Sequence, residues 1–210
     1  MNIVDTLAID TSWITIIVSL ILGITLSASC GFKVFLAPLG IGVAYHTIGF
    51  PLGVELSEGF MWIVSWQAIL VFSIAAIFEI CVGFIPGLGD FMDWVNFTIV
   101  PFMGIIATSS FLVIEDPTIK WTLAIIAGGG IATMTGFTDN LVSNGVTLLS
   151  GGIGRPIVEL LNICLSIITI VLSLIVPVLA LVFVILFLIF SFFIIKKIRK
   201  KRRLKKQLSK

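Results

Sequence analysis

Long apolar segments separated by short polar joints make up most of this 210-residue chain. Segments such as 14–26 and 179–190 are apolar at nearly every position, whereas a membrane β-strand alternates apolar with polar residues. The pattern therefore predicts an all-α protein, a polytopic membrane bundle of about six hydrophobic helices in which one helix is re-entrant or broken. The expected helices cover residues 12–29, 32–48, 60–84, 90–114, 118–137 and 156–195.

Two of these segments do not fit a simple membrane span. The segment 32–48 contains Lys33, Pro38 and several glycines, so we expect it to be re-entrant rather than spanning. The segment 156–195 would be about 60 Å long as one straight helix, against a hydrocarbon core of about 30 Å. It must therefore either turn near residues 173–177 or begin as a buried half-helix.

The composition places most of the chain in lipid. Hydrophobic residues make up 59% of it and the mean hydropathy is +1.22, which exceeds what a soluble domain can bury. We divide it into a short acidic N-terminal segment 1–12, a single transmembrane domain 13–195 and a basic tail 196–210. Residues 1–12 contain Asp5 and Asp10 but no Lys or Arg, so the first apolar stretch is expected to remain as a span rather than act as a cleaved signal.

The positive charge is concentrated at the C-terminus. Every Lys and Arg except Lys33, Lys120 and Arg155 lies in the tail 196–210. Because basic residues beside a span are retained inside the cell, the pattern predicts a multi-pass protein of the cytoplasmic membrane with a cytoplasmic C-terminus. The lipid bilayer is the expected partner, with anionic headgroups at the tail as an alternative role. No aromatic residue is interleaved with these charges, so nucleic-acid binding is not expected, and a homo-oligomer stays an open alternative.

Ionisable residues within apolar segments are the candidate functional residues, because a charge in the bilayer interior costs several kcal/mol unless it has a partner or a cavity. Glu79 interrupts an apolar stretch and lies either at the interface or in the membrane, where Lys33 could partner it for proton or cation handling. Asp90 and Asp93, three apart, share one helix face and suit either helix capping or cation coordination. We take Lys33, Glu79, Asp90 and Asp93 as the candidate intramembrane polar site.

Three further ionisable residues are weaker candidates: Asp139, Arg155 and Glu159. Arg155 follows a glycine-rich loop, a setting that suits anion binding, but Arg155 and Glu159 are four apart and can equally pair with each other. The chain has no Ser-His-acid pattern, metalloprotease motif or nucleotide-binding loop. We therefore expect no catalytic residues, no cofactor and no metal site, and we do not expect an enzyme.

Two short motifs in the first half of the chain resemble a known family. One is a small-Gly-apolar-basic motif formed by Cys30, Gly31, Phe32 and Lys33. The other is a Glu followed by Pro and Asp-x-x-Asp, formed by Glu79, Pro86, Asp90 and Asp93. The pattern resembles domain-of-unknown-function family 4126, prokaryotic multi-spanning membrane proteins without an assigned activity. In the second half the chain departs from that pattern, with Asp139 where relatives tend to have basic residues. The resemblance therefore implies the architecture more than a function.

The combination of intramembrane charges and helices interrupted by Pro or Gly is typical of transporters. We therefore expect a small transporter or channel-like protein with an intramembrane polar site. One alternative is a non-catalytic membrane scaffold or assembly protein, in which the same charges form a buried pair that fixes helix register. A second alternative is a lipid-handling protein that binds anionic headgroups near Arg155.

Overall fold

The structure, a computed structural model, describes residues 3–50, 54–85, 88–150 and 154–208. Within these residues the chain forms eight α-helices and no strands, so the all-α prediction is confirmed, whereas the six-helix count is not. The helices are α1 Ile3–Cys30, α2 Leu36–Thr47, α3 Trp66–Gly83, α4 Leu88–Ser109, α5 Pro117–Leu123, α6 Gly130–Leu149, α7 Arg155–Ile175 and α8 Pro177–Leu208. A 3-10 helix, η2 Glu58–Val64, precedes α3, and a π-helical segment, η3 Ala124–Gly129, joins α5 to α6.

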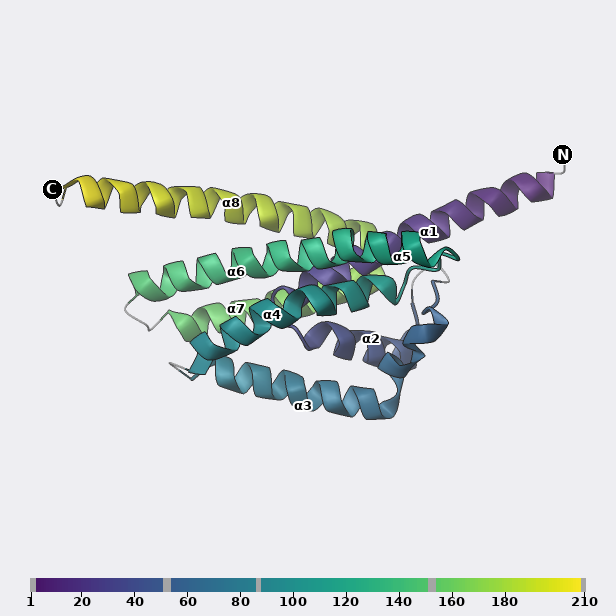
Figure 1. The fold of residues 1–210 in the computed structure, drawn as a ribbon, viewed down its shortest axis with the longest axis horizontal. Coiled ribbons are helices and arrows are strands. Elements are labelled where there is room, and N and C mark those ends of the chain that lie inside the picture. Colours follow the sequence, from purple (N-terminus) through teal and green to yellow (C-terminus); the bar gives the residue numbers. More distant parts are fainter. Residues whose placement is uncertain (1–2, 51–53, 86–87, 151–153, 209–210) are drawn as a thin grey trace.

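The helices lie side by side along the long axis of the molecule, and α1 begins at the end opposite to that where α8 ends (Figure 1). Three continuous helical stretches have the length and apolar composition needed to cross a membrane: Trp66–Gly83, Pro117–Thr147 and Arg155–Ile175. Shorter apolar helical stretches cover Ile14–Cys30, Trp94–Ser109 and Pro177–Phe190. These features are those of a membrane protein.

The first interruption lies between α1 and α2. The helix expected from residue 32 begins only at Leu36 and has 12 residues, about 18 Å, which is too short for a hydrocarbon core of about 30 Å. Residues 31–35 form turns. Gly31 lies directly against α6, because a Cβ there would be 2.7 Å from the backbone nitrogen of Gly136. This close approach brings the end of α1 into the centre of the bundle.

The later helices differ from expectation in their ends. The helix expected to finish at Phe137 continues to Leu149, because its polar residues face the interior of the bundle instead of terminating the helix. The long last segment turns at Val176 (φ −139°, ψ 84°), and Pro177 begins α8. This is the first of the two alternatives expected from the sequence, a turn near residues 173–177. The helix α8 then continues to Leu208, so the backbone of the basic tail extends this helix.

Small residues allow α1, α4 and η3 to pack closely. We call Gly23, Ser27, Gly104, Thr108 and Gly128 the small-residue contact. Thr108 Oγ1 donates a hydrogen bond of 3.1 Å to the Gly23 carbonyl, and Ser27 Oγ donates one to the Gly128 carbonyl. A Cβ at Gly23 would lie 2.9 Å from Thr108 Cα, so the backbones meet at a distance that only glycine permits.

Candidate functional site

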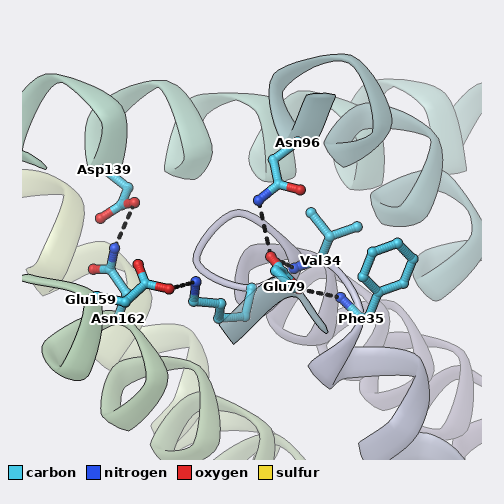
Figure 2. Close-up of polar contacts among 8 residues, drawn as sticks. Val34, Phe35, Glu79, Asn96, Asp139, Glu159 and Asn162 are labelled. Carbon is cyan, nitrogen blue, oxygen red and sulfur yellow. Dashed lines mark hydrogen bonds and ion pairs between the residues drawn. The ribbon is translucent and has the colours of Figure 1, made fainter. Parts of the chain in front are cut away.

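Two backbone amides in the turn between α1 and α2 have no helical acceptor. Glu79 of α3 accepts a hydrogen bond from each of them. Its carboxylate accepts hydrogen bonds from the amides of Val34 (3.1 Å) and Phe35 (3.2 Å) and from Asn96 Nδ2 of α4 (3.0 Å) (Figure 2). Glu79 is fully buried, with 0% exposed area. The side chain thus satisfies the two amides that directly precede α2 and connects three parts of the fold.

Lys33 is also buried, with 4% exposed area, and forms an ion pair with Glu159 of α7. Sequence reasoning proposed Glu79 as its partner. The direct contact of Lys33 is with Glu159 instead. The Glu159 carboxylate lies against Gly83 at the end of α3, where any Cβ would overlap it. The absence of a side chain at Gly83 therefore makes room for this ion pair.

A second polar pair lies next to the first. Asn162, one turn after Glu159 on α7, donates from Nδ2 to Asp139 Oδ2 of α6 at 2.9 Å (Figure 2). Asn162 is buried. Since the two residues belong to neighbouring helices, their hydrogen bond links α6 to α7 beside the Lys33–Glu159 ion pair.

These groups surround a cavity of about 40 Å³. By the usual measure, in which one water needs about 10–15 Å³, the cavity has room for a few waters or one small ion. Its walls come from the α1–α2 turn, α4, α6 and α7. The polar and charged lining side chains are Lys33, Asn96, Thr133, Asp139, Asn140, Ser143, Arg155, Glu159 and Asn162.

One buried side-chain polar atom has no hydrogen-bond partner among the described residues. This atom is Asn96 Oδ1, which is buried. Asn96 Nδ2 faces the Glu79 carboxylate, so the amide oxygen points away from it. A buried acceptor without a donor costs free energy, so Asn96 contributes less to stability than its hydrogen bond to Glu79 alone would suggest.

The structure separates the sequence candidates into two groups. It brings Lys33 and Glu79 together with the weaker candidates Asp139, Arg155 and Glu159, which lie in or next to the cavity wall. Asp90 and Asp93 belong to the first turns of α4, but their side chains lie outside the part that the structure describes. We call Lys33, Glu79, Asn96, Asp139, Arg155, Glu159 and Asn162 the cavity cluster.

Neither Asn96 nor Asn162 was selected as a site residue from the sequence. An uncharged amide within an apolar helix is a weak signal, because it can hydrogen-bond locally or face the headgroups. The sequence feature that could have identified both residues is their spacing from a carboxylate on the same helix. Asn96 follows Asp93 by three residues and Asn162 follows Glu159 by three, so each extends a polar helix face begun by a carboxylate.

Comparison with known proteins identifies the family. Residues 20–197 match the family model described as a domain of unknown function, DUF4126. The chain belongs to the DUF4126 family. The match contains all residues of the cavity cluster, and it confirms the resemblance seen in the motifs around Lys33 and Glu79. No curated protein and no solved structure gave a significant match to this DUF4126 chain.

Proposed function

We propose that this DUF4126 protein is a small transporter or channel-like protein, and not an enzyme, whose polar site is the cavity cluster. The observation that carries the proposal is a cavity between apolar helices whose wall includes the Lys33–Glu159 ion pair. Buried charges are costly in a membrane and are favoured where a polar solute must be bound away from bulk water. An ion pair serving helix packing alone would need no adjoining space.

The interrupted helices support the same proposal. Transporters place binding groups at breaks in membrane helices, where backbone groups become free to act. Here the break between α1 and α2 adjoins the cavity, and the π-helical η3 interrupts the hydrogen bonding of the α5–α6 helix. Such π-helical turns occur frequently at functional sites.

We further propose that the protein is multi-pass, lies in the cytoplasmic membrane and has its basic C-terminus in the cytoplasm. The α8 helix ends toward the same end of the molecule where α4 and α7 begin (Figure 1). Asn96, Arg155 and Glu159 belong to the first turns of those two helices. In this orientation the cavity lies in the cytoplasmic half of the bilayer.

Flux in reconstituted vesicles tests the function. Full-length protein in phospholipid vesicles should pass protons or small monovalent cations under an imposed membrane potential, measured with internal pH- or cation-sensitive dyes. The substitution Glu159→Gln removes the carboxylate of the ion pair and should lower the flux at least tenfold. Glu58→Gln is the matched control, because Glu58 is exposed in η2, outside the cavity wall.

An absence of flux for all these ions, with the protein correctly folded, would contradict the proposal and favour the scaffold alternative. In a scaffold the ion pair fixes helix register, so Glu159→Gln would reduce stability without any transport to lose. An unchanged flux in Glu159→Gln would equally contradict a transport path through this cavity.

A lipid-handling role is the second candidate, and one observation favours it. A groove of about 220 Å³ between α6, α7 and α8 has mainly apolar walls, including Val158, Leu165 and Phe187, and shares Asp139 and Asn162 with the cavity. A lipid chain in this groove would bring a headgroup toward the cavity cluster. Cross-linking with a photoreactive phospholipid should then label this groove, and Phe187→Trp should reduce the labelling.

A further inference from the structure

We infer that the cavity cluster binds one exchangeable positive charge, carried by a proton or by a small monovalent cation. The inference deepens the proposed function, because it assigns the class of ion to the same site. It depends on the charges that surround the cavity and on the size of the space.

The described charges around the cavity are unequal. Three carboxylates contribute, namely Asp139 of α6, Glu159 of α7 and Glu79 of α3, which bonds to the lining residue Asn96. The two cations are Lys33 in the α1–α2 turn and Arg155 at the start of α7. Asp90 and Asp93 of α4 are both acids, and their side chains are outside the described part. The cluster therefore has at least one carboxylate more than it has cations.

Lys33 cannot neutralise two carboxylates at once. Its ion pair is with Glu159, and among the described contacts the fully buried Glu79 is held by backbone amides and Asn96 instead of by a cation. The hydrogen bonds to Glu79 disperse its charge but do not cancel it. An excess charge held between apolar helices must be compensated, and a proton or a bound cation is the usual means.

The cavity of about 40 Å³ limits the guest to the size of a hydronium, ammonium, sodium or potassium ion. A guest in this space would lie beside Asp139 and Glu159, the two carboxylates of the cavity wall.

Thermal unfolding of the full-length protein in lipid nanodiscs tests the inference. At fixed alkaline pH and ionic strength, sodium, potassium and ammonium chloride are each compared with choline chloride. A binding cation should raise Tm by about 5–10 °C at one hundred times its Kd. If the charge is a proton, the three salts should match choline, and acidification in choline should raise Tm instead.

Variants that change the charge of the cluster should change the Tm response in a predictable direction. Asp139→Asn and Glu159→Gln each remove one negative charge, so the response to the cation or to acid should fall to less than a quarter of the wild-type response. Lys33→Gln removes one positive charge, which leaves one more carboxylate uncompensated, and should enlarge the response to the cation or to acid. Glu58→Gln is the control and should respond as wild type, because this exposed residue lies in η2.

A wild-type Tm that responds neither to the three cations nor to acid would overturn the inference. A response that survives in both Asp139→Asn and Glu159→Gln would also overturn it. A cation or acid response without flux in vesicles would leave this inference standing and contradict transport. Flux without such a response would leave transport standing and contradict the inference.

Discussion

The small-residue contact and the cavity cluster both contain polar groups buried between apolar helices, but they satisfy them differently. In the small-residue contact, Ser27 and Thr108 donate to backbone carbonyls of adjoining helical segments, and glycines remove the space between backbones. In the cavity cluster, charged and amide side chains from different helices bond to one another around open space. The first arrangement holds helices together, and the second also leaves room for a guest.

This difference shows that a buried polar residue is not by itself a sign of function in a membrane bundle. Hydroxyl groups can be satisfied by a carbonyl of their own helix, as Thr169 Oγ1 is by the Leu165 carbonyl at 2.7 Å. A long charged side chain needs a partner from another element, as Lys33 does. Functional candidates are therefore better selected by where a polar group finds its partner than by burial alone.

The largest effect is expected from breaking the ion pair on one side. Lys33→Met leaves Glu159 as an unpaired buried charge, which should cost about 3–5 kcal/mol of unfolding free energy. The double variant Lys33→Met with Glu159→Leu removes both charges and should recover most of that loss. Thermal unfolding in nanodiscs measures both. A double variant as unstable as the single one would show that this ion pair is needed for packing, which would remove the contrast between the two regions.

The next effect concerns the α1–α2 turn. Glu79→Leu leaves the amides of Val34 and Phe35 without an acceptor, which should cost about 2–4 kcal/mol in total. Glu79→Gln keeps one acceptor and should cost about 1 kcal/mol. Hydrogen exchange of these two amides checks the cause, because only the Leu variant should exchange them much faster. Equal stability of the two variants would contradict the role of Glu79 as the acceptor for these amides.

The ionisable residues of the site could be predicted because they interrupt apolar segments, where each charge demands an explanation. Lys33 and Glu79 were selected on this ground, and both lie buried beside the cavity. Their direct partners could not be predicted. Lys33 meets Glu159, a residue 126 positions later, and that contact depends on how α7 packs against the α1–α2 turn.

Helix ends show a similar limit. The turn at Val176 could be predicted from Pro177 and from the excessive length of the segment. The end of α6 could not, because polar residues after Phe137 look the same in sequence whether they leave the membrane or line a cavity. Asn96 was not predicted either, for a related reason. An uncharged amide in an apolar helix indicates a polar site only once its burial is known.

A smaller effect is expected in the small-residue contact. Gly128→Ala places a methyl group against Thr108 and the Gly104 backbone, and overpacking of this kind should cost about 1–3 kcal/mol. Gly130 is the matched control in the same glycine run, because a Cβ there meets nothing within 4 Å. Gly130→Ala should be stabilising, by no more than about 1 kcal/mol, since alanine favours the helix. Thermal unfolding in nanodiscs measures both stability changes, and the same measurement should show that neither variant loses the cation or acid response of the cavity.

The smallest effect is expected where a buried hydroxyl bonds within its own helix. Thr169 of α7 is fully buried, yet its hydrogen bond runs to the carbonyl four residues earlier, which is already a helix acceptor. Thr169→Val keeps most of the side-chain volume and should change the unfolding free energy by less than about 1 kcal/mol, because the lost bond links no two helices. Ser27→Ala is the comparison variant, since its hydroxyl bonds to the Gly128 carbonyl on another helical segment. Thermal unfolding should therefore rank Ser27→Ala as the more damaging of the two, and the opposite order would mean that a bond between helices is no better guide to importance than burial.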